Sequence, residues 1–214
     1  MKSTLPVILL GAGGHAKVLI DAMRLQSVEI LGIVDVNSDN KGKMLMGVPV
    51  IGGDEELIQY APQQIRLVNG IGSVRVSSLR REVFETLKNK GYQFERVIHP
   101  SSIIAGDVEL SEGVQIMAGA VIQAGSKVSA NTIINTRASI DHDCLIGRHV
   151  HISPGATLSG GIVVGEDAHV GTGAVVIQGI QIGQHSLVAA GAVVTRNVLN
   201  NVTVAGVPAR ELKR

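Results

Sequence analysis

Aromatic side chains are nearly absent from this sequence of 214 residues, at 2% of the chain, although 45% of the residues are hydrophobic. The core must therefore be built from Val, Ile, Leu and Ala, in a space that has little use for rings. The single cysteine, Cys144, excludes an internal disulfide and is typical of a reducing compartment. The formal net charge is only +1, so nothing in the composition suggests a nucleic-acid or membrane-surface partner.

The apolar start of the chain, "LPVILLGAGG", is too short to span a bilayer and lacks a signal-peptide cleavage pattern. We therefore expect a soluble, cytoplasmic protein. About 150 residues per domain is the usual prior, so the length fits one domain or two small ones.

A period of six residues runs through the second half of the chain. Stepping by six from Ile104 to Val194 meets sixteen positions, and each of them is Ile, Val or Leu. The residues four places after these positions are small or aliphatic throughout. Such a period fits neither an amphipathic helix nor an alternating strand. It is typical of the short strands and tight corners of hexapeptide β-helix repeats.

The expected corners carry residues that tolerate a positive φ. Three places after each aliphatic position stands Gly, Asn, Asp or His, with Arg137 as the one exception. In chain order these residues are Asp107, Gly113, Gly119, Gly125, Asn131, Arg137, Asp143, His149, Gly155, Gly161, Asp167, Gly173, Gly179, His185, Gly191 and Asn197. Three hexads would make one triangular coil, and we expect stacked coils about 4.8 Å apart. The pattern resembles the left-handed β-helix of the hexapeptide acyltransferases, which implies an all-β left-handed parallel β-helix over residues 96–214.

Residues 1–95 predict a Rossmann-like α/β half-domain instead. "VILLGAGGHAKVLIDAM" is an apolar strand, a glycine loop and an amphipathic helix, and "VEILGIVDV" is a second strand that ends at Asp35. "IRLVNGIGS" is a third strand, followed by a helix from about Val76 to Lys90 and a strand near Phe94 to Ile98. Alternating strands and helices predict a parallel sheet with ligands at the carboxyl ends of its strands.

The glycine loop of this half-domain is a candidate phosphate site. Gly11, Gly13 and Gly14 would let the backbone approach a phosphate at a helix N-terminus. Lys17 in the first helical turn opposes the helix dipole, which favours an anion there. Asp35 is placed for a ribose or a base edge. Only one half of a dinucleotide fold is present, which favours a mononucleotide-bearing ligand over NAD; a tight turn without a ligand is the alternative.

The stretches "GAGGHAK", "INTRASIDHDCLIG", "HISPGATLSGG" and "VAGVPAR" are similar to the sugar O- and N-acyltransferases of the bacillosamine and sialic-acid pathways. The likeness is to acetyltransferases that act on a UDP-4-amino-4,6-dideoxy-N-acetyl-hexose, and it implies acetyl-coenzyme A bound along the β-helix. The UDP site that the resemblance implies comprises Gly13, Gly14, His15, Asp35 and Gly72. Val36 is a departure, because family members can carry a second acid at this place.

Three of the seven histidines fall within "IDHDCLIGRHVH". His142 lies at an expected corner, and Gly160, eighteen residues later, would stack one coil above it. A glycine there would leave a backbone N–H accessible to a thioester carbonyl that gains negative charge. We expect His142 to be the general base that deprotonates a sugar amine. The resemblance assigns the same role, with Asp143 polarising the histidine; Asp141 is the alternative carboxylate.

The resemblance further implies that His151 contacts acetyl-coenzyme A and that Asn135 belongs to the site. His151 precedes an aliphatic position on a flat side of the coil and should point outward, where a merely solvated histidine is the alternative. His149 and His185 hold expected left-handed corners, so we interpret both as structural.

His142 and His151 are half a turn apart around the coil, too far to touch one thioester in a single chain. Since the resemblance implies one shared site and a homotrimer, we expect the active site between adjacent chains. His142 and Gly160 of one chain would face His151, Thr172 and Ala190 of the next, with pantetheine in the groove.

The leading hypothesis is an acetyl-coenzyme A-dependent N-acetyltransferase that acts on the 4-amino group of a UDP-linked amino-deoxy sugar. Acetylation of a sugar hydroxyl, as in sialic-acid O-acetylation, would use the same base. A non-catalytic nucleotide-sugar scaffold is a further alternative. A zinc hydrolyase of the carbonic anhydrase type would need three convergent histidines, which the spacing of His142 and His151 does not resemble, so no metal is expected.

Overall fold

The computed structural model describes residues 5–73 and 78–212, which form two compact units. Unit 1 runs to Pro100 and unit 2 begins at Ser101, apart from Ser73, which is grouped with unit 2. The sequence predicts this boundary five residues earlier, between residues 95 and 96.

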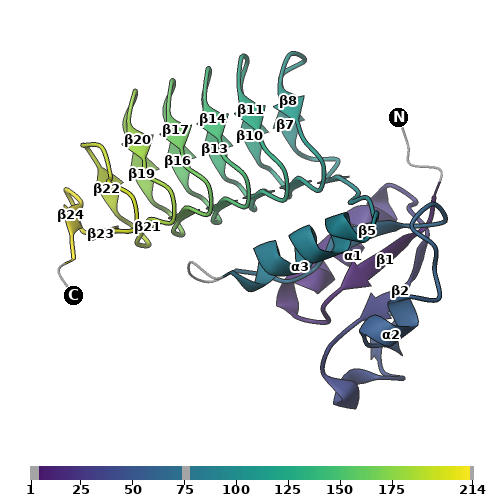
Figure 1. Ribbon diagram of the computed structural model, residues 1–214. Helices are drawn as coiled ribbons and strands as arrows, with labels where there is room; N and C mark the ends of the chain where they lie inside the picture. The colour runs from purple at the N-terminus through teal and green to yellow at the C-terminus, as the bar shows by residue number, and fades with distance from the viewer. Residues whose placement is uncertain (1–4, 74–77, 213–214) are drawn as a thin grey trace. The chain divides into compact units, whose positions relative to one another are not determined.

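Unit 1 is a largely parallel sheet with helices, as predicted (Figure 1). Its elements are β1 (Val7–Leu10), α1 (Gly14–Leu25), β2 (Ile30–Val34), a 3₁₀ turn η1 (Ser38–Asn40), β3 (Met44–Leu45), β4 (Val48–Gly52), α2 (Asp54–Leu57), β5 (Arg66–Asn69), α3 (Leu79–Asn89) and β6 (Val97–Ile98). The strand order is β3-β4-β2-β1-β5, with only β3 antiparallel to its neighbour. Val76, the expected start of the last helix, lies outside the described residues.

The core of unit 1 lies around β1, whose four residues are all buried. A central parallel strand is covered on both faces, which explains why it reads as a continuous apolar run rather than an alternating one. All four aromatic residues of the chain belong to unit 1, and the rings of Phe84 and Phe94 pack with their centroids 4.4 Å apart. The scarcity of aromatics is therefore a property of unit 2.

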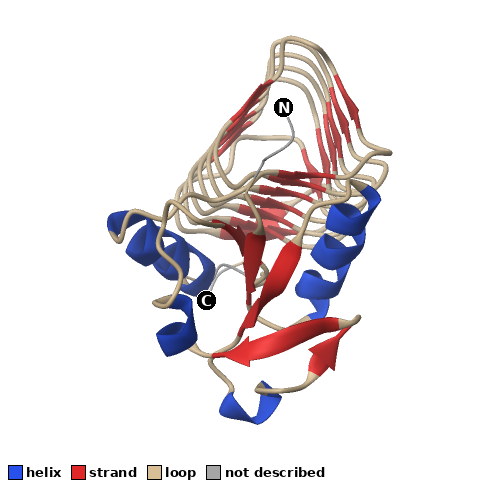
Figure 2. Ribbon diagram, turned by 90° about the vertical axis from the view of Figure 1, so that its right-hand side faces the viewer, coloured by secondary structure: helices blue, strands red, loops and turns tan. Residues whose placement is uncertain are grey.

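Unit 2 is a stack of triangular coils, which Figure 2 shows end-on with strands on three sides. Sixteen two-residue strands build it: β7 (Ile103–Ile104), β8 (Glu109–Leu110), β9 (Gln115–Ile116), β10 (Val121–Ile122), β11 (Lys127–Val128), β12 (Ile133–Ile134), β13 (Ser139–Ile140), β14 (Leu145–Ile146), β15 (His151–Ile152), β16 (Thr157–Leu158), β17 (Val163–Val164), β18 (His169–Val170), β19 (Val175–Val176), β20 (Gln181–Ile182), β21 (Leu187–Val188) and β22 (Val193–Val194). The chain ends in β23 (Thr203–Ala205) and β24 (Arg210–Glu211). Every third strand joins the same parallel sheet, as in β7-β10-β13-β16-β19-β22.

The predicted six-residue repeat is confirmed strand by strand. The second residue of each of these sixteen strands is a member of the aliphatic series, and fourteen of the sixteen are buried. Pairing joins residues eighteen positions apart, as in Ile122 with Ile140 and then Leu158. One triangular coil therefore takes three hexads, and its narrow interior is filled by Ile, Val, Leu and small residues.

The left-handed corners are confirmed at most of the predicted positions, including Arg137 with φ 58° and His149 with φ 59°. The prediction is wrong at Asp107 and Asn197, which do not have a positive φ. Both lie in the terminal coils, where a side-chain oxygen replaces a backbone carbonyl as the acceptor. An oxygen of Asp107 accepts from Gly125 N at 3.0 Å, and that of Asn197 accepts from Gln181 N at 2.9 Å.

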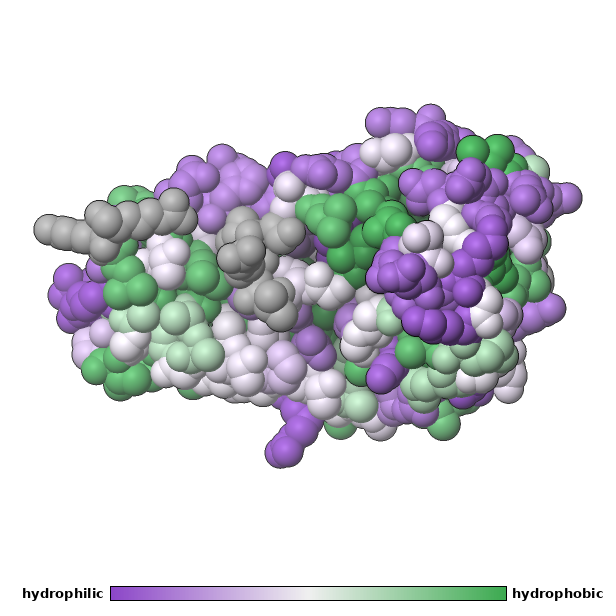
Figure 3. Space-filling model, turned by 90° about the horizontal axis from the view of Figure 1, so that it is seen from below, coloured by the Kyte–Doolittle hydropathy of each residue, from purple (hydrophilic) through white to green (hydrophobic). Residues whose placement is uncertain are grey.

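Apolar side chains reach the surface in several places, and the space-filling view shows green, apolar areas between purple, hydrophilic ones (Figure 3). None of the helices in the described part of the chain combines the length and the apolar character that a bilayer-spanning segment needs.

Candidate active site

His142 lies in the turn between β13 and β14, at a corner of the coil. The next residue, Asp143, holds the left-handed position with φ 58°. This tight corner turns the neighbouring side chains of His142 and Asp143 toward the same region of solvent, and about half of the His142 side chain stays exposed.

Two carboxylates act on His142 in different ways. Asp143 Oδ2 lies 2.8 Å from the ring atom Nδ1, whereas Asp141 Oδ1 accepts a bond from the backbone N of His142 at 2.8 Å. The hydrogen bond to Asp143 raises the pKa of His142, and the negative charge of Asp141 adds to that effect. An acceptor at Nδ1 requires the proton there, so Nε2 of the neutral ring keeps its lone pair.

Gly160 closes the space beside the free ring nitrogen. A Cβ on Gly160 would lie 2.5 Å from Cε1 and 3.0 Å from Cδ2 of His142, and closer still to Nε2. The chain also links these coils directly, because Gly161 N donates to the carbonyl of His142 at 2.8 Å. The imidazole therefore packs over Gly160, one coil further along the stack, in a place that a side chain at position 160 would take from it.

Cys144 follows the His142 corner but points into the coil. Its thiol is buried, lies 3.2 Å from the carbonyl oxygen of Ser159, and has a pKa raised by burial. A thiol with a raised pKa is a poor nucleophile, which leaves His142 as the exposed candidate for reaction at this corner.

A second polar cluster lies on another face of the coil, on β15 and β18. His151 Nε2 lies 3.0 Å from Asn135 Nδ2, and the rings of His151 and His169 meet edge to face at 4.8 Å. His151 is buried, so the alternative of a solvated histidine is wrong. His169, which the sequence does not single out, bonds Ser153 Oγ through Nε2 at 3.0 Å, and burial lowers the pKa of His169 to about 4. Its spacing of eighteen residues from His151 was the available signal.

Thr172 and Ala190 lie on an exposed edge of the stack. Gly173 N donates to the carbonyl of Pro154 at 3.0 Å, and Gly191 N donates to that of Thr172 at 2.9 Å. These bonds align the turns at residues 154–155, 172–173 and 190–191 along one edge, as the repeat predicts. This edge is distinct from the one that carries His142.

His149 and His185 hold corners, as the sequence predicts. His149 is buried with Nδ1 2.9 Å from Asn131 Nδ2, and His185 Nδ1 lies 3.5 Å from Asp167 Oδ2. Within residues 5–73 and 78–212, no three or more His, Cys, Asp or Glu side chains come together in a way that could hold a metal ion.

In unit 1, the glycine loop runs from the end of β1 into α1. Gly11 has φ +90°, which favours glycine, and Gly13 is the N-cap of α1. A Cβ on Gly13 or Gly14 would meet nothing within 4 Å, so both face open space. The first turn of α1 holds no acidic side chain and carries the exposed Lys17. The helix N-terminus is therefore open to an anion.

Asp35 ties this loop to the end of β2. Its Oδ2 accepts from Ala12 N at 2.6 Å, and its Oδ1 accepts from Asn37 N at 2.8 Å. A Cβ on Gly72 would lie 3.2 Å from the Cβ of His15, so the second glycine turn packs closely against α1. The structure therefore brings Gly13, Gly14, His15, Asp35 and Gly72 to one edge of the sheet.

A buried arginine that the sequence does not single out holds the second glycine turn. Arg80 Nη1 donates to the carbonyls of Asn69 at 2.7 Å and Ile71 at 2.8 Å, and Asn69 Nδ2 donates back to the Arg80 carbonyl at 3.0 Å. Nothing in the sequence around "SSLRREVF" distinguishes this arginine from its half-buried neighbour Arg81, because the burial of Arg80 depends on the docking of α3.

Comparison with known proteins agrees with both units. The family model of the PglD N-terminal domain matches residues 6–87, and the model of the hexapeptide repeat of succinyl-transferase matches residues 137–178 and 161–196. PerB from Caulobacter crescentus, solved with CoA and GDP-perosamine, is 38% identical over 99% of both chains, with a TM-score of 0.91. A histidine-to-asparagine variant of the Caulobacter crescentus perosamine N-acetyltransferase, with the same ligands, is 37% identical over 99% of both chains, with a TM-score of 0.91.

The acetyltransferase domain of PglB from Neisseria gonorrhoeae FA1090, solved with acetyl coenzyme A, is 34% identical over 98% of this chain and 100% of that chain, with a TM-score of 0.89. The predicted fold class is confirmed, as is the prediction of an acetyltransferase with acetyl-coenzyme A as co-substrate. The chain thus belongs to the acetyl-coenzyme A-dependent, hexapeptide-repeat sugar N-acetyltransferases of nucleotide-sugar pathways.

Proposed function

We propose that this enzyme transfers the acetyl group of acetyl-coenzyme A to the 4-amino group of a nucleoside-diphosphate-linked amino-deoxy sugar. The observation that carries the proposal is the exposed His142 ring, bonded to Asp143 at 2.8 Å and packed over Gly160. UDP is the nucleotide that the sequence resemblance implies, and GDP is the nucleotide in the PerB complex, so these two are the candidates.

His142 acts as the general base. The sugar amine attacks the thioester carbonyl carbon, and Nε2 of His142 accepts a proton from the nitrogen as the new C–N bond forms. The bond to Asp143 holds the ring in the tautomer with the proton on Nδ1 and stabilises the imidazolium that results. Collapse of the tetrahedral intermediate breaks the C–S bond, and the departing thiolate takes the proton from His142 to give free coenzyme A.

Gly160 contributes space and a backbone dipole. Without a Cβ at this position, the thioester carbonyl is able to approach the ring nitrogen closely. The N–H of Gly160 is our candidate donor to the oxygen that becomes negative in the tetrahedral intermediate.

The nucleotide sugar binds unit 1. We propose that the pyrophosphate lies at the N-terminus of α1, against Gly13 and Gly14, where open backbone and Lys17 favour negative charge. Asp35 lies beside the ribose, and His15 with Gly72 bounds the other side of the phosphate site.

The coenzyme binds in a groove between two copies of the chain in a homotrimer. His142 lies between β13 and β14, whereas the pair of His151 and Asn135 lies on the face that contains β15. Because these faces differ, one thioester cannot reach both groups within a single chain. We propose that His142 and Gly160 meet His151 of the partner subunit, and that the partner's edge at Thr172 and Ala190 lines the pantetheine.

The first test is an acetyl-transfer assay. The purified protein should release one equivalent of thiol per sugar from acetyl-coenzyme A and a UDP- or GDP-linked 4-amino sugar. Mass spectrometry and NMR should identify an amide on the 4-nitrogen. An acetyl ester on a sugar hydroxyl would instead establish O-acetylation, and binding without thiol release would indicate a scaffold.

The second test is subunit complementation. A batch with His142→Ala and a batch with His151→Ala are unfolded, mixed and refolded, so that some interfaces pair two intact histidines. Activity above that of either parent is expected. Mixed trimers that form but remain at the parental level would show that the site does not combine these two residues across chains.

A further inference from the structure

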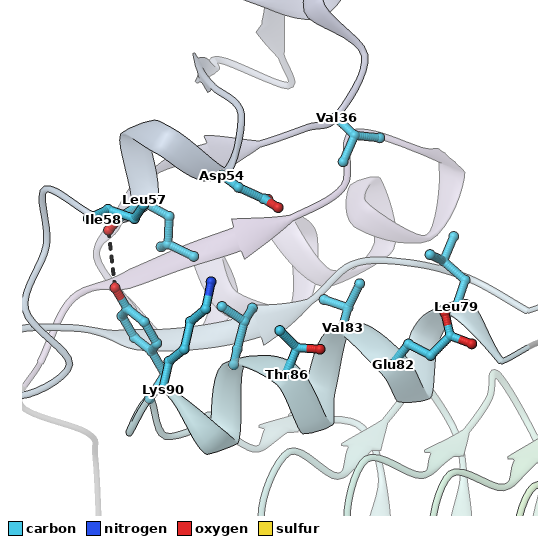
Figure 4. Close-up of a pocket in the computed structure, with 11 residues that line it drawn as sticks. Val36, Asp54, Leu57, Ile58, Leu79, Glu82, Val83, Thr86 and Lys90 are labelled. Carbon is cyan, nitrogen blue, oxygen red and sulfur yellow. Dashed lines mark hydrogen bonds between the residues drawn. The ribbon is translucent and has the colours of Figure 1, made fainter.

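Unit 1 contains a pocket whose lining residues are separate from the candidate site residues described above. It has a volume of about 220 Å³ and lies between α2 and α3 (Figure 4). Tyr92 supports one side, since its hydroxyl oxygen lies 2.9 Å from the carbonyl oxygen of Tyr60 and 3.2 Å from that of Leu57. Sites for drug-sized ligands span about 300–1,000 Å³, so this space suits one ring system rather than a whole nucleotide sugar.

The pocket opens at the edge of the sheet that carries the glycine loop. One of its lining residues, Val36, directly follows Asp35, whose carboxylate bonds Ala12 N in that loop at 2.6 Å. Another, Leu79, is the first residue of α3, which follows the second glycine turn. A nucleotide with its phosphates on the glycine loop and its ribose beside Asp35 would therefore point its base toward this pocket.

Apolar side chains line the mouth of the pocket and remain exposed to solvent, which is unfavourable without a ligand. Val36 is 89% exposed, Ile58 72% and Leu79 53%, and they come from three separate segments. Exposed apolar groups gathered around a hollow are typical of a ligand site rather than of a free surface. They would cover the two faces of a flat ring.

Glu82 and Thr86 of α3 also line the pocket, and two further groups of opposite charge suit one kind of ring edge. Asp54, at the start of α2, and Lys90, just past the end of α3, extend into the space between the two helices (Figure 4). Guanine presents two adjacent donors, N1–H and N2–H₂, which a carboxylate accepts as a pair, beside an O6 acceptor that suits an ammonium group. Uracil presents two carbonyl oxygens on either side of a single N–H, so a carboxylate opposite this edge is repelled.

We infer that this pocket holds the nucleobase of the acceptor substrate, and that Asp54 and Lys90 make it select guanine over uracil. The inference rests on the proposed function, since it assumes a nucleotide-linked sugar, and it names GDP as the carrier of that sugar.

The test measures binding of GDP and UDP to the full-length protein by isothermal titration calorimetry. Hydrogen bonds to a charged group contribute about 1.5–3 kcal/mol, so GDP should bind about 10- to 100-fold more tightly than UDP. Asp54→Asn turns one acceptor into a donor and should remove most of this preference, because GDP loses its charged acceptor and the repulsion of UDP is relieved. Glu55→Gln is the matched control, because this exposed neighbour does not line the pocket and its loss of charge should alter neither affinity.

Equal or tighter binding of UDP overturns the inference, as does an Asp54→Asn variant that weakens both nucleotides alike. The acetyl-transfer assay separates this result from the proposed function. Turnover of a UDP-linked sugar but not of its GDP analogue would leave the function standing and refute the guanine site. Tight, Asp54-dependent binding of GDP without turnover of either sugar would support the guanine site and refute the proposed function.

Discussion

Replacement of Gly160 by alanine should disable the enzyme without unfolding it. Gly160 does not have a positive φ, so its backbone accommodates a side chain. The added Cβ would lie 2.5 Å from Cε1 of His142, whereas ordinary van der Waals contact begins at 3.4 Å. The ring must therefore move by about 1 Å, and such a misplacement costs about 100-fold in rate.

The effect on stability should be small, because the group that must move is the end of a half-exposed side chain. Gly147 provides a contrast, since a Cβ there would meet the backbone N of Glu166 at 2.8 Å and distort the stack itself. Gly106 is the matched control: it lies in unit 2, and a Cβ on it would meet nothing within 4 Å. Gly106→Ala should retain wild-type activity.

Steady-state thiol release gives kcat for Gly160→Ala, and thermal unfolding gives its Tm. The double variant with His142→Ala adds a decisive comparison, because a substitution that acts only through the ring has no further effect once the ring is gone. Wild-type kcat in Gly160→Ala, or a further 100-fold loss in the double variant, would refute the assignment of Gly160 as the packing surface of His142.

Three further predictions concern ionisable groups. Asp143 raises the pKa of His142, and the base must be neutral, so kcat should increase with pH through this pKa. Asp143→Asn should move this rise in kcat to lower pH. A rise at the wild-type pH would show that Asp143 does not act on His142. His169 has a folded-state pKa of about 4, below its ordinary value, so only the unfolded chain takes up a proton as pH falls from about 6.5 toward 4. Urea unfolding should therefore show a loss of up to about 3 kcal/mol over this window, which His169→Gln removes; an unchanged pH dependence in the variant would contradict it. Arg80→Met leaves two loop carbonyls without their donor and should lower the free energy of unfolding by about 2–4 kcal/mol, whereas a wild-type urea midpoint would show that these bonds contribute nothing.

The β-helix was predictable in detail because the residue types within each hexad determine the local structure of that hexad. An inward aliphatic, a small residue and a corner residue suffice for one side of the coil, and each repeat contacts only its neighbours. The corner prediction is wrong at Asp107 and Asn197, which lie at the two ends of the stack of coils. In the terminal coils a neighbour is missing on one side, and side-chain oxygens complete the bonding instead.

The parts that the sequence did not predict depend on packing between segments far apart in the chain. The repeat placed His151 on an outward face, but only the fold shows that it is buried against His169. Likewise, no local signal distinguishes Arg80 as a buried clamp. The pocket around Asp54 and Lys90 arises from two helices whose separation the pattern of apolar residues does not fix.

The most direct measurement of the proposed role of His142 is kcat for thiol release by His142→Ala, at saturating acetyl-coenzyme A and nucleotide-linked amino sugar. Loss of a general base should lower kcat by about 10²–10⁴-fold, while KM for both substrates stays close to that of the wild type. A His142→Ala enzyme that retains the wild-type kcat would contradict the account, because no proton acceptor would then be needed at this corner of the coil.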